Sequence, residues 1–340
     1  MNIPYRTRSL LKRLGIALLA AALVIGLVLG IWFVWLQRFV VYTRDQGAVF
    51  DMTLSQEFGE GQLAVPPEPG ETVSIYYNEG ENAINTSRDL TQIVGYYADA
   101  DAMAKSMDTV LEQVKALPRG TPVMLDVKSP KGAFFYSSNI NQQRSGSIDA
   151  QKMDELIEHL KDNGSYLIAR LPALRDYYYG LEHVPDGLPT SKGYLWADDD
   201  YCYWLNPARQ GTLTYLLQII TELKDRGFNE VVFDAFHFPD TKSIVFNGDK
   251  TEALNNAAKT LVTAGATESF AVSFVGSDPT FKLPEGRSRL YLEGVAAIDA
   301  ANVAGNTGIA EPSTHLVFLT EIHDTRFDIY CVLRPLEAAH

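Results

Sequence analysis

Short apolar segments alternate with amphipathic helical segments from residue 93 to residue 275. The apolar segments suit strands that are buried on both faces, as strands are in a parallel sheet. The predicted strands are 93–97, 122–127, 166–169, 230–233 and 269–275, and the predicted helices are 100–117, 149–163, 211–226 and 251–263. Because helices join parallel strands through right-handed crossovers, this order predicts an α/β fold.

The last part of the chain has a weaker pattern. Strands are predicted at 289–292, 316–319 and 329–333, which would complete the eight strands of a (β/α)8 barrel. The connections 277–288 and 321–327 are too short, or too rich in proline and glycine, for full helices. We therefore expect a TIM-like barrel that is irregular in its second half. An open doubly wound sheet is the alternative, although no glycine-rich nucleotide loop follows the first strand.

The N-terminal part has the composition of a membrane anchor. Residues 14–37 contain no charged residue, and about 20 apolar residues are enough for a helix to cross a bilayer. Arg6, Arg8, Lys12 and Arg13 precede this segment, which favours a cytoplasmic N-terminus. A cleaved signal peptide is the competing interpretation, but its apolar region is usually only about 7–15 residues long.

These features predict four parts of the chain. They are a basic cytoplasmic tail at 1–13, a transmembrane signal anchor at 14–37, a stalk at 38–71 and the barrel at 72–340. The barrel would then lie outside the cytoplasm on a single-pass membrane protein. The formal net charge of −13 argues against a nucleic-acid partner. Cys202 and Cys331 are too few for a disulfide framework, and two separate buried thiols are favoured over a pair.

Polar residues stand at the ends of three predicted strands. Asp126 and Lys128 end the second strand, Arg170 ends the third, and Asp234 ends the fourth with His237 close behind. Since neighbouring barrel strands end at one mouth, Asp126, Arg170 and Asp234 should converge there. Two carboxylates beside a pocket are what glycoside hydrolysis requires, and an arginine between them favours their ionised form. A structural ion-pair network is the alternative interpretation.

The segment from Arg175 to Asn206 is the most aromatic part of the chain. Flat rings with polar tips suit stacking on sugar rings, and a loop after a barrel strand lies on the functional face. Trp196, Tyr203 and Trp204 are therefore candidate substrate contacts. The alternative is that these rings only pack over the barrel.

Metal and nucleophile chemistry is less favoured. Asp198, Asp199 and Asp200 lack the alternating spacing of calcium loops, so a solvated acidic turn is the better interpretation. The histidines have no paired ligand spacing, and there is no G-x-S-x-G elbow. We expect no metal and no cofactor.

Five segments of the chain resemble the motifs of a family of glycoside-hydrolase-like proteins. The segments are 124–128 (MLDVK), 168–170 (IAR), 204–207 (WLNP), 227–239 (GFNEVVFDAFHFP) and 334–335 (RP). They are similar to the family's V-I-D-V-K, I-A-R, W-x-N-P, G-F-D-E-I-x-F-D-Y-x-R-F-P and R-P motifs. The family has a TIM-barrel fold, is distantly like the α-amylase group and is often found on bacterial cell surfaces. The resemblance therefore implies a barrel that acts on carbohydrate.

The chain also departs from the family pattern. His237 and Ala235 stand where the family has arginine and tyrosine. After the fifth strand the chain has AVSFVG at 271–276, where the family has an aspartate before a phenylalanine-glycine pair, and a later P-M-x-Y-P motif is missing. These departures leave open a barrel that has lost hydrolysis.

The sequence leads to two main hypotheses. In the first, the protein hydrolyses a polysaccharide or oligosaccharide, with Asp234 as nucleophile or base and Asp126 in electrostatics or substrate contact. Glu321 is the expected proton donor, and Glu293 is the second choice. Arg170, His237, Lys128 and the three aromatic candidates would bind the substrate. In the second hypothesis, a degenerate barrel binds glycan or a cell-surface protein without catalysis. A solute-binding module is a third, weaker alternative.

Overall fold

The computed structural model describes residues 40–43, 47–50, 90–140, 148–276 and 281–336. The chain divides into two units, Met1–Val73 and Ser74–His340. In the first unit, β1 (Val40–Thr43) and β2 (Gly47–Phe50) form an antiparallel pair within the segment expected to be a stalk. The tail 1–13 and the anchor 14–37 lie outside the described residues. In the part of the chain that is described, no helix combines the length and the apolar composition needed to cross a membrane.

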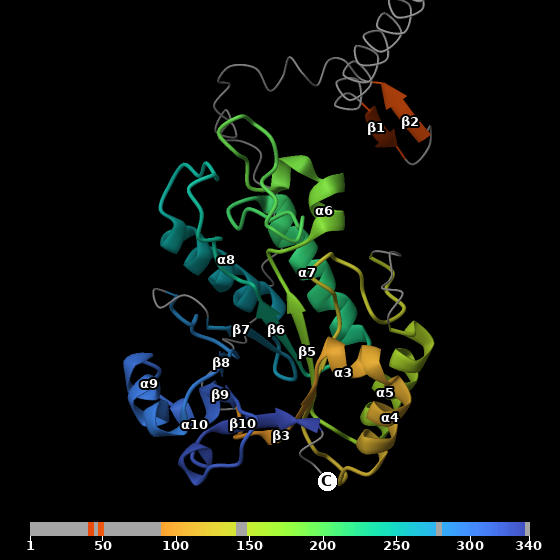
Figure 1. The fold of residues 1–340 in the computed structure, drawn as a ribbon. Coiled ribbons are helices and arrows are strands. Elements are labelled where there is room, and N and C mark those ends of the chain that lie inside the picture. The colour runs from red at the N-terminus through yellow and green to blue at the C-terminus, as the bar shows by residue number, and fades with distance from the viewer. Residues whose placement is uncertain (1–39, 44–46, 51–89, 141–147, 277–280, 337–340) are drawn as a thin grey trace, which may run out of the picture. The chain divides into compact units, whose positions relative to one another are not determined.

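The second unit is a closed barrel of eight parallel strands (Figure 1). The strands follow one another around the barrel in chain order, and β10 closes it by pairing with β3. They are β3 (Val94–Ala98), β4 (Val123–Asp126), β5 (Leu167–Pro172), β6 (Glu230–Asp234), β7 (Ala271–Val275), β8 (Leu290–Glu293), β9 (Leu316–Leu319) and β10 (Cys331–Pro335). The predicted (β/α)8 barrel is therefore confirmed, and the open doubly wound sheet is excluded.

The main helices of the first half lie where the sequence predicts them. They are α3 (Ala100–Lys105), α4 (Met107–Lys115), α5 (Ala150–Asp162), α7 (Gln210–Asp225) and α8 (Lys250–Gly265). The predicted helix 100–117 is in fact two helices, because Ser106 adopts an extended backbone and caps α4 with its side chain. A short helix, α6 (Tyr177–Glu182), and a 3₁₀ turn, η2 (Val184–Asp186), stand inside the aromatic segment.

The second half of the barrel is irregular, as predicted. Among the described residues between β7 and β8 there is no helix. Between β8 and β9 the chain forms η3 (Ala297–Asp299), α9 (Ala300–Asn306) and the single turn α10 (Pro312–His315). Only η4 (Thr325–Phe327) stands between β9 and β10.

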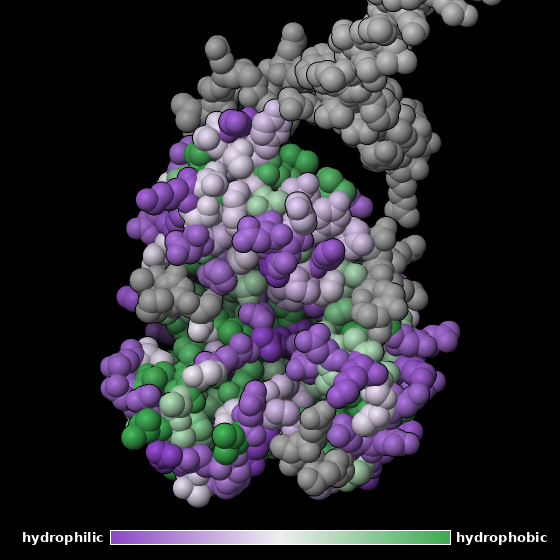
Figure 2. Space-filling view, in the orientation of Figure 1, coloured by the Kyte–Doolittle hydropathy of each residue, from purple (hydrophilic) through white to green (hydrophobic). Residues whose placement is uncertain are grey.

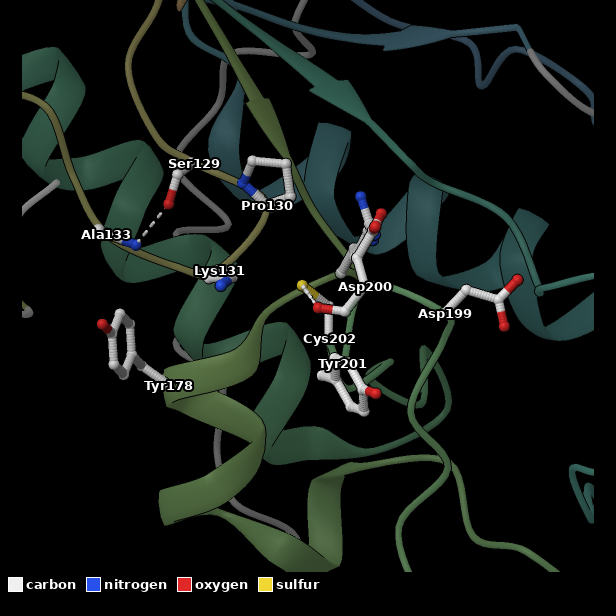
Figure 3. Close-up of a pocket in the computed structure, with 10 residues that line it drawn as sticks. Ser129, Pro130, Lys131, Ala133, Tyr178, Asp199, Asp200, Tyr201 and Cys202 are labelled. Carbon is white, nitrogen blue, oxygen red and sulfur yellow. Dashed lines mark hydrogen bonds and ion pairs between the residues drawn. The ribbon is translucent and has the colours of Figure 1, made fainter. Parts of the chain in front are cut away.

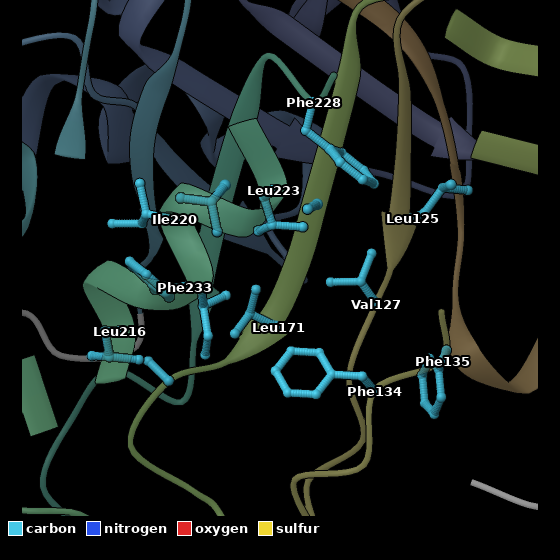
Figure 4. Packing of buried hydrophobic residues seen from close by; sticks show 14 of the residues in the cluster. Leu125, Val127, Phe134, Phe135, Leu171, Leu216, Ile220, Leu223, Phe228 and Phe233 are labelled. Carbon is cyan, nitrogen blue, oxygen red and sulfur yellow. The ribbon is translucent and has the colours of Figure 1, made fainter. Parts of the chain in front are cut away.

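Two layers of apolar side chains hold the barrel together. Outside the strands, residues of β4, β5 and β6 such as Leu125, Leu171 and Phe233 pack with Leu216 and Leu223 of α7 (Figure 4). All five are buried. The inner layer comes from alternate residues of the strands, namely Ile93, Met124, Ile168, Val232, Val275, Tyr291, Val317, Cys331 and Leu333. The alternation matters for the site, because on β4, β5, β6 and β8 the next inward residue lies at the mouth.

A buried polar cluster closes the N-terminal end of the barrel. Glu230 at the start of β6 has no exposed area and accepts hydrogen bonds from Ser273, Tyr166 and Tyr291. Arg289 is 1% exposed and lies with its Nη1 2.5 Å from Glu230 Oε2. Every oxygen of this carboxylate is therefore paired, as a buried charge requires. Elsewhere in the fold, both cysteines are buried and unpaired, as predicted.

Candidate active site

Arg170 lies at the centre of three carboxylates from three other strands. Its Nη2 is 2.6 Å from Asp234 Oδ2 and 2.7 Å from Glu293 Oε1. Its Nε is 3.2 Å from the same oxygen of Asp234 and 3.9 Å from Asp126 Oδ1. The structure thus brings together the expected trio of Asp126, Arg170 and Asp234, and it adds Glu293.

The register of the strands explains this convergence. Asp126, Arg170 and Asp234 each stand two residues after an inward apolar residue of β4, β5 or β6. Asp126 and Arg170 are paired neighbours across the sheet. Glu293 follows the inward Tyr291 by the same interval on β8. All four side chains therefore project from the C-terminal ends of their strands, where barrel enzymes place their chemistry.

Asp126 has an unusual acidity for an aspartate. Burial raises its pKa to about 6, and the Arg170 charge and a hydrogen bond from Ala100 oppose that rise without cancelling it. The Ala100 N–H, at the start of α3, donates to Asp126 Oδ2 at 2.9 Å. The nearby charges of Asp99 and Asp234 raise the pKa further. Asp126 can therefore exchange a proton near neutral pH.

Asp234 receives N–H donors on both of its oxygens. Arg170 donates to Oδ2, and the backbone N–H of Ala235 donates to Oδ1 at 2.6 Å. Ala235 has a φ of 48°, a left-handed conformation that is uncommon for residues other than glycine. This backbone turn aims the Ala235 N–H at the carboxylate, so the donors around Asp234 match an anionic group.

A cavity of about 540 Å³ opens beside this cluster. Its lining includes Asp99, Asp126, Arg170, Trp204, Asp234 and His237. Hydrophilic surface gathers around a hollow on the face of the molecule shown in Figure 2. The size lies within the roughly 300–1,000 Å³ typical of small-ligand pockets.

Trp204 and His237 form an aromatic wall of the cavity. Their ring centroids are 5.0 Å apart, and the Trp204 indole N–H donates to Asp198 Oδ2 at 3.0 Å. Nδ1 of His237 lies 3.0 Å from the carbonyl oxygen of Phe238, which leaves Nε2 available for other contacts. An aromatic side chain next to a carboxylate pair is suited to a sugar ring.

The other predicted aromatic contacts lie elsewhere. Trp196 packs beside Trp204, with ring centroids 6.4 Å apart, and Tyr203 stacks on Tyr177 at 5.5 Å. Neither is among the residues that line the cavity. For Trp196 and Tyr203, the alternative interpretation, rings that pack over the barrel, describes the structure better.

Lys128 has a structural partner. Its Nζ is 2.7 Å from Asp176 Oδ2, and both side chains have no exposed area. Asp176 also caps α6 through the Tyr179 N–H and accepts a hydrogen bond from Tyr215. Lys128 contributes to the cavity wall, and its enclosed ammonium group pairs with Asp176 of the aromatic segment.

Glu321, the expected proton donor, is exposed and follows β9. Its charge contributes, after burial and the charge of Asp99, to the raised pKa of Tyr97 on β3. It makes no ion pair with Arg170, whereas Glu293 does. Sequence reasoning ranked Glu293 second and did not find Tyr97. The two-residue interval from the inward Tyr291 to Glu293 is the signal that would have favoured Glu293.

Arg175 pairs with two carboxylates of the acidic turn at residues 198–200. Arg175 Nε is 2.5 Å from Asp198 Oδ2, and its Nη2 is 2.6 Å from Asp200 Oδ2. Within the described ranges, no group of three or more histidine, cysteine, aspartate or glutamate side chains is arranged to hold a metal ion.

Comparison with known families gives the site a context. A family model described as "Putative glycosyl hydrolase domain" matches residues 95–273, more than half of the 340 residues. The chain belongs to this family. The resemblance stated from the motifs is therefore confirmed. The matched part of this glycosyl hydrolase domain contains Asp126, Arg170 and Asp234 and ends before Glu293. No curated protein matches the chain.

The chain is similar to solved structures at low sequence identity. An α-galactosidase from Geobacillus stearothermophilus, in complex with stachyose, is 10% identical with a TM-score of 0.51. The match covers 74% of this chain and 41% of that enzyme, so the chain spans less than half of its length. A hypothetical protein from Ruminiclostridium thermocellum is 21% identical with a TM-score of 0.44, covering 53% of this chain and 96% of that one. The α-galactosidase supports the barrel fold and no finer conclusion.

Proposed function

We propose that the protein is a glycoside hydrolase that acts on polysaccharide or oligosaccharide through Asp234 and Asp126. One observation carries the proposal: these two carboxylates line the same cavity at the C-terminal mouth of the barrel, with Arg170 between them. Glycoside hydrolysis needs two such groups in different protonation states. The family match is consistent with a carbohydrate substrate.

The environments of the two aspartates suit them to different roles, one as proton donor and the other as nucleophile or base. Asp126, with a pKa of about 6, donates its proton to the glycosidic oxygen as the bond from that oxygen to the anomeric carbon breaks. Asp234, surrounded by N–H donors, remains the carboxylate that attacks the anomeric carbon or takes a proton from the attacking water. In this scheme Asp126 replaces Glu321 as the acid. Arg170 and Glu293 fix the position of Asp234.

The test is a hydrolysis screen of the full chain in detergent against polysaccharides and oligosaccharides. Asp234→Asn should lower cleavage by about 10³-fold or more, because removal of a central catalytic group costs at least that much in well-studied hydrolases. Asp240→Asn is the matched control, since Asp240 is exposed and does not line the cavity. Equal cleavage by wild type and Asp234→Asn would remove Asp234 from the mechanism.

A second candidate function is glycan binding without hydrolysis. The observation that favours it is the position of Arg170 Nη2, which bonds both Asp234 and Glu293. A sugar ring cannot lie between those two carboxylates unless the guanidinium moves away. This candidate predicts that wild type and Asp234→Asn bind the same glycans and that neither cleaves any of them.

We also propose that the chain is a single-pass membrane protein with its barrel outside the cytoplasm. The support is the uncharged segment 14–37 and the four cationic residues before it. Fractionation of cells, followed by protease treatment from the outside, tests both points. A barrel that stays in the supernatant after cell breakage, or resists external protease in intact cells, would contradict the proposal.

A further inference from the structure

A second cavity, of about 680 Å³, adjoins the first. Its lining includes Ser129, Lys131, Tyr178, Asp199 and Tyr201 (Figure 3). Two more residues, Pro130 and Arg175, line both cavities. The two cavities therefore lie side by side, with Pro130 and Arg175 between them.

The shared wall is held rigidly. Arg175 pairs with Asp198 on the side of the first cavity and with Asp200, which lines the second. Asp198 in turn accepts hydrogen bonds from the Trp204 indole and from the backbone N–H groups of Asp200 and Cys202. One ion-pair cluster thus fixes an aromatic wall of the first cavity and the turn that borders the second.

That turn presents an aromatic ring to solvent at a strained position. Tyr201 has a φ of 60° and is 79% exposed. A tyrosine rarely adopts this left-handed conformation, and strained residues of this kind cluster at active sites and ligand-binding positions. Tyr178, on α6, lines the same cavity. Lys131 also lines this cavity, and an ammonium group there can donate hydrogen bonds to a ligand.

We propose that the second cavity is a sugar-binding subsite of the active site, so that the substrate is a glycan chain that spans both cavities. Tyr178 and Tyr201 stack on its sugar rings, and Lys131 donates to its hydroxyl groups. The position at which the glycan is cut rests on the function proposed above, whereas the binding of the glycan does not.

The charges of the cavities select a neutral or amino-sugar chain. The first cavity is lined by five aspartates against one lysine and two arginines, and that lysine is already neutralised by Asp176. The second is lined by two cationic and two acidic side chains. A polyuronate would bring its carboxylates against this surplus of negative charge, which disfavours binding.

The experiment measures dissociation constants in the Asp234→Asn background, in which cleavage does not consume the ligand. The probes are cello-, malto-, chito- and galacto-oligosaccharides of two to six units, with oligogalacturonates as the anionic series. Affinity should rise with chain length in one of the neutral or amino-sugar series. Tyr201→Asn, which keeps a residue that tolerates the left-handed backbone, should weaken binding of the longest members roughly threefold to tenfold.

The control is Tyr194→Asn, which removes another exposed ring of the same segment (61% exposed, against 79% for Tyr201) that lines neither cavity. It should leave all affinities unchanged, and Tyr178→Ala should behave like Tyr201→Asn. Affinity that does not depend on length, or on Tyr201 and Tyr178, overturns the subsite, as does tightest binding of the oligogalacturonates or no binding at all. Length-dependent binding that needs Tyr201, combined with no cleavage by the wild type, supports the subsite and contradicts the hydrolase.

Discussion

Arg170 donates to a single oxygen of Asp234 through both Nε and Nη2, at 3.2 and 2.6 Å. The other oxygen of Asp234 is held by the Ala235 N–H. The burial of Arg170 would lower its pKa, but the carboxylates of Asp234, Asp126 and Glu293 raise it above its ordinary value. The guanidinium therefore stays charged, and the rotation of Asp234 is fixed from two sides.

Arg170→Met should reduce cleavage by about 10²-fold, as removal of one charged or hydrogen-bonding group that organises an active site typically does. It should also raise the pH at which kcat/KM declines on the alkaline side of the profile. The reason is that Arg170 opposes the raised pKa of Asp126, so that pKa rises further without it. A pH profile of kcat/KM checks both points. An unchanged midpoint would separate Arg170 from the titration of Asp126.

The wild-type pH profile follows from the pKa of Asp126. If its protonated form donates to the leaving oxygen, kcat/KM should decline as pH rises through about 6. Asp126→Asn should abolish this decline at high pH, together with most of the activity. A limb that persists in Asp126→Asn would assign the proton donor to another group, and Glu293→Gln is then the variant to compare.

Asp126 should also make the stability of the fold depend on pH. Its pKa is raised from 3.8 to about 6, so folding favours the protonated carboxyl. That contribution is fully present below the unfolded pKa and is lost as pH rises through about 6. Asp126→Asn should therefore exceed the wild type in free energy of unfolding by about 3 kcal/mol at pH 7.5 and by little at pH 3.5. Denaturant titrations at the two pH values measure this difference, and an equal gain at both would contradict it.

The buried pair of Lys128 and Asp176 should dominate the stability of the aromatic segment. Lys128→Met leaves a buried carboxylate without its cation, which typically costs about 3–5 kcal/mol. Lys152→Met is the matched control, because Lys152 and Asp108 form an exposed pair that should contribute little to stability. Chemical unfolding of the two variants tests the contrast. Similar losses would show that burial does not set the strength of the pair.

Substitution of a residue by glycine usually lowers the stability of a fold, but Ala235→Gly should not. Glycine adopts a φ of 48° without the steric cost of a Cβ, so we expect no loss of stability and a gain of up to about 1 kcal/mol. Ala301→Gly, at an exposed position of α9, should cost roughly 0.5–1 kcal/mol. Thermal unfolding distinguishes the two, and a clear loss for Ala235→Gly would mean that its methyl group is needed for packing.

The fold could be predicted because each strand is a short apolar run and each long helix has one apolar face. β9 begins and ends at the predicted residues, and β6 extends the prediction by Asp234 alone. The break at Ser106 was missed because methionines and valines keep their helical spacing across it. Serine as an N-cap was the available signal.

Only those site residues that stand at the ends of predicted strands could be predicted from the sequence. Asp126, Arg170 and Asp234 follow from position along neighbouring strands, whereas the raised pKa of Asp126 depends on burial that no local pattern reveals. The aromatic segment folds on itself over some thirty residues. Which of its rings face a cavity is decided by contacts such as Arg175 with Asp198, which the sequence does not encode locally.

Strand β6 carries an acidic residue at each end, and the two side chains lie in opposite environments. Glu230 is enclosed and saturated with partners at the closed end, while Asp234 faces the open mouth. The residues that bind Glu230 do not line the mouth cavity, so a substitution at the mouth leaves the buried cluster of the closed end intact. A lineage built on this scaffold can therefore gain, change or abandon catalysis while the architecture persists.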